Sequence, residues 1–361
     1  MGNCPLIQLG IRWGQRRIES ATREKIRLDT ADFAKVAVDS RYVAEPPGAI
    51  TAKRVLVTGA SGFIGRPLVQ RLLRAGYSVR ATTRGAAPLP QGVEVAIIPD
   101  LLHAIDWEPL LRGVDLVIHL AGLAHADNKS TDIRAFDTIN RRATEQLAQA
   151  ARRAEVERFI FISSVRAQVG ASASQIIHED DEALPTNKYG RSKLAAESAV
   201  RASGVPFTIL RPVAIYGPQP RGNIKTLTRL ASASYPLPFL GLDSRRSLLG
   251  IENFISAVLF ALNEPATLGE IFLVADRGSM TVGQIFATLR EAQSRSPRLI
   301  HVPPLFLRLI LLLLNRGYLW ERISGDLVVD TSKLQALGWH PNVDTHQGLV
   351  AMMQSERPPG I

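Results

Sequence analysis

The stretch that most restricts how this chain can fold is RVLVTGASGFIG at residues 54–65. Its apolar, β-branched beginning is typical of a strand that is covered on both faces of a parallel sheet. Gly59, Gly62 and Gly65 follow at the spacing where a tight turn, a close ligand and a close helix each exclude a side chain. An amphipathic helix and a second strand come next. The sequence therefore predicts a nucleotide-binding βαβ unit, with a dinucleotide pyrophosphate on the first amides of the helix.

Composition limits the class of protein. The chain has 361 residues, of which 46% are hydrophobic and 21% are charged, as in a globular protein with a well-buried core. Its one cysteine, Cys4, can form neither an internal disulfide nor a zinc site. We therefore expect a protein of a reducing compartment, the cytoplasm, without a metal centre.

Charge and hydropathy bear on two further classes of partner. The net charge is +10, but the basic residues are scattered among acids and do not interleave with aromatic residues. That pattern favours a small anionic substrate over nucleic acid. The most apolar stretch, 305–314, is about ten residues long and contains Arg308, whereas a membrane span needs about 20 residues. We expect a helix that is buried or touches lipid, and no transmembrane segment.

Residues 1–50 show little sustained periodicity and close on a Glu-Pro-Pro-Gly sequence at 45–48. Because a βαβ unit of this kind normally stands near an N-terminus, we interpret them as an N-terminal extension that is poorly ordered. Three interpretations compete: a regulatory or membrane-touching tail, a misassigned start codon, and a small helix that packs on the domain.

From Lys53 onward, strand-like and helix-like segments alternate, which predicts an α/β fold with a Rossmann-type doubly wound parallel sheet. Prolines break the regular pattern after the strand that ends near residue 211. We therefore expect a dinucleotide-binding domain at 51–215 and a smaller, mainly substrate-binding domain at 216–361. A strand near 270–275 is a candidate to return to the sheet. Other expected strands lie at 93–99, 116–120, 158–163 and 207–211, and expected helices lie near 107–112 and 133–153.

Tyr189 and Lys193 are four residues apart in YGRSK, which places both side chains on one face of a helix. An ammonium beside a phenol favours the phenolate, so Lys193 is expected to lower the pKa of Tyr189 toward the working pH. The tyrosine could then act as a general acid or base. Ser164 follows a predicted strand, where its hydroxyl can bind the substrate oxygen that the tyrosine protonates. We predict a catalytic triad of these three residues.

The order of these motifs resembles that of extended short-chain dehydrogenases/reductases of the NAD-dependent epimerase/dehydratase family. The similarity covers about residues 53–350. The motifs that carry it are GASGFIG at 59–65, Asp100-Leu101, HLAG at 119–122, Asn140 to Thr144, FISS at 161–164, YGRSK at 189–193 and LRPVAIYGP at 210–218.

The resemblance implies a set of residues for each ligand. For the cofactor they are Gly59, Ser61, Gly62, Phe63, Ile64, Gly65, Thr83, Arg84, Asp100, Leu101, Leu120, Ala121, Gly122, Asn140, Ile162, Tyr189, Lys193, Arg211 and Pro212. For a UDP- or dTDP-sugar they are His125, Ser164, Arg166, Tyr189, Asn223, Arg246, Arg322 and Asp326. A helix N-terminus at Asn223 and the arginine guanidinium groups both suit phosphate oxygens. Family analogy also makes a homodimer a fair expectation.

The end of the second strand predicts the choice of cofactor. In NAD-binding relatives an acidic residue there binds the adenosine ribose hydroxyls and would repel a 2′-phosphate. Here Thr83 stands at that position and Arg84, which could pair with the phosphate, follows it. We therefore expect NADP to be preferred over NAD.

Three functions remain open from the sequence. The first is reduction of a UDP-4-keto-6-deoxy-N-acetylhexosamine at carbon 4 for polysaccharide biosynthesis. The second is a UDP-glucose 4-epimerase-like reaction with retained NAD. The third, from another class, is a non-catalytic NAD(P)-binding regulatory protein, against which the intact triad speaks. A dehydratase is disfavoured because the Asp-Glu pair that follows the catalytic serine in such relatives is missing at 165–168.

Overall fold

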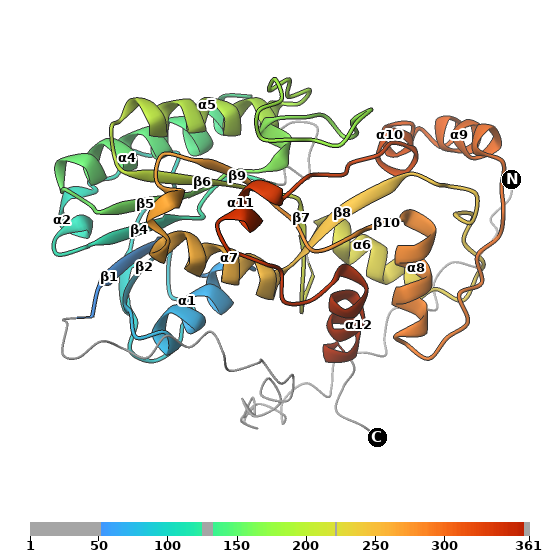
Figure 1. Ribbon diagram of the computed structural model, residues 1–361, viewed down its shortest axis with the longest axis horizontal. Helices are drawn as coiled ribbons and strands as arrows, with labels where there is room; N and C mark the ends of the chain where they lie inside the picture. Colours follow the sequence, from blue (N-terminus) through green and yellow to red (C-terminus); the bar gives the residue numbers. More distant parts are fainter. Residues whose placement is uncertain (1–51, 125–132, 221, 357–361) are drawn as a thin grey trace, which may run out of the picture. The chain divides into compact units, whose positions relative to one another are not determined.

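The computed structural model describes residues 52–124, 133–220 and 222–356, all within one compact unit that begins at Thr51. Its centre is a seven-stranded sheet in the order β3-β2-β1-β4-β5-β6-β9, and every pair of neighbours is parallel (Figure 1). The strands are β1 (Arg54–Thr58), β2 (Ser78–Thr83), β3 (Glu94–Ile97), β4 (Leu116–His119), β5 (Arg158–Ile162), β6 (Phe207–Pro212) and β9 (Ile271–Val274). This architecture confirms the expected doubly wound α/β fold.

Helices cover both faces of the sheet because its strands alternate apolar side chains between two cores. In β1, Val55 and Val57 belong to one core and Leu56 to the other. The first core packs beneath α1 (Gly65–Arg74) and α7 (Ile251–Asn263). The second packs beneath α2 (Glu108–Leu111), α4 (Ala143–Arg153) and α5 (Lys188–Ala202), on the opposite face in Figure 1.

The chain reverses direction across the sheet between β1 and β4. It runs outward from β1 through β2 to β3 and then crosses back to place β4 on the other side of β1. Ligands of open α/β sheets bind at such a switch point, beyond the carboxyl ends of the strands. The glycine turn that follows β1 lies at this edge.

A second, three-stranded sheet has the order β10-β8-β7 and its own apolar cluster. Its strands are β7 (Ala214–Tyr216), β8 (Arg245–Gly250) and β10 (Ser279–Thr281), and the helices around it are α6 (Gly222–Ala231), α8 (Val282–Glu291) and α12 (Thr345–Ser355). The chain visits this sheet after β6 and returns through α7 to pair β9 with β6. The remaining helices are α9 (Pro304–Leu313), α10 (Tyr318–Ser324), α11 (Ser332–Ala336) and the 3₁₀ segments η4 (Val165–Ala167) and η5 (Pro265–Thr267).

The single long helix expected at 133–153 is divided in the structure. It consists of α3 (Ile133–Phe136), the π-helical turn η3 (Asp137–Arg142) and α4. The wider π turn contains Asn140, whose side chain contacts two other segments of the site. The expected strand at 93–99 is shortened to β3, at the outer edge of the sheet. Within the described ranges no helix is long and apolar enough to cross a membrane.

Candidate active site

The glycine turn has the geometry that a dinucleotide pyrophosphate requires. Gly59 has a φ of 71°, and a Cβ there would lie 2.9 Å from the backbone nitrogen of Ala121. A Cβ at Gly65 would overlap the carbonyl oxygen of Gly59, so α1 can approach β1 only with glycine there. No side-chain cap occupies the start of α1 at Ile64. These residues therefore fit the cofactor: no side chain caps the start of α1, and Ala121 and Gly122 lie partly open opposite the turn.

A hydrogen-bonded chain fixes the ends of β1 and β4 below that turn. The Nδ1 of His119 lies 2.7 Å from the hydroxyl of Thr58, and its Nε2 lies 2.8 Å from that of Thr144. Thr144 donates its own proton to the Asn140 carbonyl, so Nε2 carries the imidazole proton and Nδ1 accepts from Thr58. Burial, followed by the charge of Lys193, lowers the pKa of His119 to about 3. His119 is therefore a neutral structural group.

The three predicted catalytic residues come together where β5 ends and α5 begins. Ser164 caps η4 and is placed so that its side chain lowers the pKa of Tyr189. Lys193 is buried, donates from Nζ to the carbonyl oxygen of Ile162 at 2.8 Å, and lies 4.7 Å from the centre of the Phe161 ring. Burial lowers the pKa of Lys193 to about 8, while the charge of Glu197 opposes that shift.

The electrostatics of Tyr189 differ from the sequence-based expectation. Burial raises its pKa above the ordinary value, and the groups that oppose this shift are Ser164, through its hydrogen bond, and the cation of Arg166. Lys193 is not among the groups that lower it. The reason is position: the Lys193 ammonium is turned toward the Ile162 carbonyl at the end of β5. Among the described residues, the cation that lowers the pKa of Tyr189 is Arg166, in the segment after the two serines.

Asn140 fixes the loop that follows β4. Its Oδ1 accepts from the amide of Leu123 at 2.7 Å, and its Nδ2 donates to the Leu123 carbonyl at 3.0 Å and to Ser192 at 2.9 Å. A Cβ at Gly122 would lie 3.0 Å from Asn140 Oδ1 and 3.4 Å from Lys193 Nζ. The loop, the π turn and α5 therefore meet around Gly122.

A buried network beneath the triad was missed by sequence reasoning. Glu197 is fully buried and accepts from Arg211 Nε at 2.9 Å, from Arg211 Nη2 at 2.6 Å and from the Ser163 hydroxyl at 2.5 Å. Arg211 Nη1 donates to Gln168 at 2.9 Å, and Gln168 in turn binds the carbonyl of Asp181. The Arg211 guanidinium, expected to contact the cofactor, is thus bound within the protein. The signal available in the sequence was the acidic residue four positions after Lys193.

Four more of the expected cofactor residues lie at or just beyond the ends of β2 and β3. Thr83 is buried and donates to the carbonyl of Gly85. Arg84 is exposed and pairs with Asp100 at 2.9 Å. The amide of Leu102, followed by Arg84, holds the pKa of Asp100 below its ordinary value. Leu101 is buried in the second core.

Three of the expected substrate residues form an arginine cluster. Burial, followed by the charge of Arg322, lowers the pKa of Arg166. Burial, followed by the charges of Arg166 and Arg322, lowers the pKa of Arg246 to about 10. Arg246 donates to the carbonyls of Ala171, Glu321 and Gly325, and its Nε is buried without a partner among the described residues.

The remaining expected substrate residues have different outcomes. Asp326 accepts from the amide of Arg245 at 2.5 Å, so it joins β8 to the segment after α10. Asn223 lies at the start of α6, as expected, but its side chain is outside the described part of the chain. His125 also lies outside the described residues.

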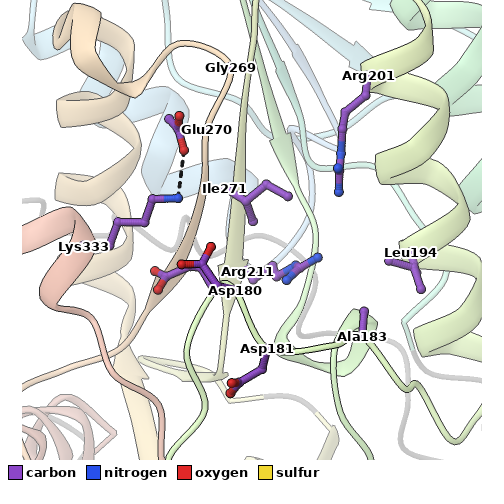
Figure 2. Close-up of a pocket in the computed structure, with 11 residues that line it drawn as sticks. Asp180, Asp181, Ala183, Leu194, Arg201, Arg211, Gly269, Glu270, Ile271 and Lys333 are labelled. Carbon is purple, nitrogen blue, oxygen red and sulfur yellow. Dashed lines mark ion pairs between the residues drawn. The ribbon is translucent and has the colours of Figure 1, made fainter.

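A pocket of about 340 Å³ lies beside this site, and none of its lining residues belongs to the triad (Figure 2). Charges of both signs line it, including Asp180, Asp181, Arg201 and the ion pair between Lys333 and Glu270, which Figure 2 marks with a dashed line. Arg211 reaches its wall, but its guanidinium is held by Glu197 and Gln168. Neither the glycine turn nor the arginine cluster formed by Arg166, Arg246 and Arg322 lines the pocket, so it is not the site expected for the cofactor or the sugar.

Gly190 supplies a test of how α5 is positioned. A Cβ there would overlap the carbonyl oxygen of Arg166, so an alanine would push α5 away from η4 and separate Ser164 from Tyr189. We expect Gly190→Ala to lower the free energy of unfolding by about 1–3 kcal/mol, and turnover by about tenfold to a hundredfold. Chemical denaturation and steady-state kinetics measure both effects. Gly85→Ala is the stability control, since a Cβ there would meet nothing within 4 Å; equal stability of the two variants would contradict the prediction.

Comparisons with known proteins agree with this geometry. The model of the NAD dependent epimerase/dehydratase family matches residues 55–275. A UDP-glucose 4-epimerase from Vibrio cholerae is 30% identical over 313 residues, covering 84% of this chain and 95% of that protein. An N-acetyl-alpha-D-glucosaminyl-diphospho-ditrans,octacis-undecaprenol 4-epimerase from Escherichia coli O157:H7 is 27% identical, covering 69% and 75%.

A solved structure supports the fold. UDP-glucuronic acid 4-epimerase from Bacillus cereus, in complex with NAD, superposes with a TM-score of 0.68 at 23% identity, covering 84% of this chain and 96% of that one. The family match, the two similar relatives and the serine, tyrosine and lysine that lie together in the structure confirm the resemblance seen in the sequence. The chain belongs to the NAD-dependent epimerase/dehydratase family and is an enzyme of the extended short-chain dehydrogenase/reductase type.

Proposed function

We propose that this enzyme interconverts the two epimers at carbon 4 of a UDP-sugar, with NAD retained through the cycle. The observation that carries the proposal is the meeting of Ser164, Tyr189 and Lys193 at the end of β5, opposite the glycine turn. The bound nicotinamide supplies a reversible hydride acceptor. All proton transfer falls to the chain's own residues.

In this proposal Tyr189 takes the proton from the carbon 4 hydroxyl and later returns it to the ketone oxygen. Ser164, whose side chain lowers the pKa of the phenol, holds the same oxygen. Arg166 favours the phenolate that forms when the proton has left the phenol. Lys193, anchored on the Ile162 carbonyl beside Gly122, is the cation for the nicotinamide ribose hydroxyls.

The arginine cluster supports a diphosphate-linked sugar as the substrate class. Arg166, Arg246 and Arg322 concentrate positive charge beside the triad, and guanidinium groups suit phosphate oxygens. The two relatives differ in the carrier that their names give, uridine diphosphate in one and diphospho-undecaprenol in the other, but a diphosphate is common to both. We propose a UDP-sugar as the primary substrate.

A second candidate is net reduction of a UDP-4-keto-6-deoxy-N-acetylhexosamine with NADPH. Two observations favour it: Thr83 leaves the end of β2 without a carboxylate, and the raised pKa of Tyr189 keeps the phenol protonated, the form that donates to a ketone oxygen. The decisive experiment incubates the enzyme with UDP-4-hydroxy and UDP-4-keto sugars and follows reduced nicotinamide together with product identity. Formation of the carbon 4 epimer without net cofactor turnover supports the epimerase; stoichiometric NADPH consumption supports the reductase.

The ion pair between Arg84 and Asp100 gives a prediction about the cofactor. Because Asp100 already binds the guanidinium, and its carboxylate would repel another anion, we expect the wild type to bind NADH at least as tightly as NADPH. Asp100→Asn should release Arg84 and raise the affinity for NADPH relative to NADH by about tenfold. Fluorescence titration of both cofactors measures the ratio.

The control for this test is the double variant Asp100→Asn with Arg84→Ala, in which the gain in NADPH affinity should disappear. A wild type that already prefers NADPH, and loses this preference in Arg84→Ala alone, would contradict the prediction. That result would favour the reductase.

A further inference from the structure

Helix α9 exposes an apolar surface that the proposed chemistry does not use. Seven large apolar side chains on it or just after it are exposed: Leu305, Phe306, Leu309, Ile310, Leu312, Leu313 and Leu314. Only Leu307 is buried. Soluble monomers rarely leave a contiguous apolar patch of this size in water unless it serves as a binding surface.

The exposed side chains share one side of the helix. Successive residues of an α-helix are about 100° apart, so these seven cover roughly half of its circumference. Leu307 and the half-buried Leu311 lie on the other side, toward the protein. Arg308 is exposed at the border of the apolar arc, and the exposed Arg316 follows the helix. A long arginine side chain in such a place can keep its charge in a polar layer while its stem stays apolar.

The charge around α9 selects the partner. From Ala292 to Trp320 the sequence contains four arginines, Arg295, Arg298, Arg308 and Arg316, and no aspartate or glutamate. A second copy of the chain, docked symmetrically through the same surface, would bring these arginines together, with only Glu291 and Glu321 flanking the segment in sequence to compensate them. Anionic lipid headgroups would instead complement the arginines while acyl chains accept the apolar side chains.

We propose that α9 lies in the interface of an anionic phospholipid bilayer and docks the enzyme on the membrane surface. With ten residues the helix is too short to span a bilayer, which agrees with a position parallel to the surface. Figure 1 shows α9 beside α10, the helix that carries Arg322 and the Glu321 carbonyl bound by Arg246. Docking therefore brings the arginine cluster of the substrate site close to the lipid headgroups.

Vesicle co-sedimentation of the full chain tests the proposal. We expect binding to phosphatidylcholine vesicles that contain phosphatidylglycerol, weaker binding to phosphatidylcholine alone, and loss of the difference at high salt. The double variant Leu305→Glu with Leu313→Glu replaces side chains that are 73% and 78% exposed, and should bind at least about tenfold more weakly. The matched control is Ile97→Glu with Leu184→Glu, at 70% and 63% exposure, which should bind within about twofold of the wild type.

A second pair of variants isolates the charge. The double variant Arg308→Glu with Arg316→Glu should lose the preference for anionic vesicles. The control is Arg152→Glu with Arg153→Glu, which replaces two exposed arginines of α4 and makes the same change in net charge. This control should keep the preference. Because binding is measured without cofactor or sugar, its outcome does not depend on the proposed reaction.

Two results would overturn the proposal. One is a wild type that does not sediment with either kind of vesicle at low salt. In that case, a glutamate variant of α9 that only dissociates a dimer would show that the surface binds a second copy of the chain. The other is equal vesicle binding by the α9 variants and their matched controls.

Discussion

Replacing Tyr189 by phenylalanine is expected to lower turnover by about two to four orders of magnitude while cofactor affinity stays nearly unchanged. Phenylalanine keeps the ring of this half-buried residue and removes only the hydroxyl. The substrate oxygen would then have no group to exchange its proton with. Initial rates at saturating sugar, together with cofactor titration, measure the two quantities separately.

Tyr77→Phe is the matched control for this substitution. The Tyr77 hydroxyl donates to Asn263 at 2.9 Å on the outside of the sheet, away from the triad. Its loss should leave turnover within about twofold of the wild type. If Tyr189→Phe retained a tenth or more of the wild-type turnover, Tyr189 would have no place in proton transfer, and the proposed reaction would need another acid.

The fold could be predicted because its signals are local. The apolar run of β1 and the glycine spacing together require a strand, a tight turn and a helix at fixed positions, and the structure has all three. The division of the helix at 133–153 could not be predicted in this way. Its π turn is stabilised by Asn140 through contacts with Leu123 and Ser192, which are distant in sequence.

The placement of the expected site residues could be predicted where a motif fixes the spacing, but not where their partners come from separate elements. Tyr189 and Lys193 share a helix face, and the structure brings both to the end of β5. The cation that lowers the pKa of Tyr189 is Arg166, which comes from another segment. Likewise, no local pattern indicates that Arg84 and Asp100, sixteen residues apart, form an ion pair.

The buried ion pair below the triad gives the second large expected effect, on stability. Glu197 and Arg211 are almost fully buried and share two hydrogen bonds. Glu197→Ala would leave the arginine charge in the core without its partner, and would also remove the acceptor of Ser163. We expect the free energy of unfolding to fall by about 3–5 kcal/mol, measured by chemical denaturation.

Two variants separate the loss of a buried charge partner from the loss of any carboxylate. Glu157→Ala breaks the ion pair with Lys53, in which both side chains are about half exposed, and should cost less than about 1 kcal/mol. The double variant Glu197→Leu with Arg211→Met removes both buried charges. It should therefore be more stable than the single variant Glu197→Ala. Some cost remains, because Ser163 and Gln168 still lose a hydrogen-bond partner. A double variant as unstable as the sum of its two single variants would show that the cost comes from packing rather than from an uncompensated charge.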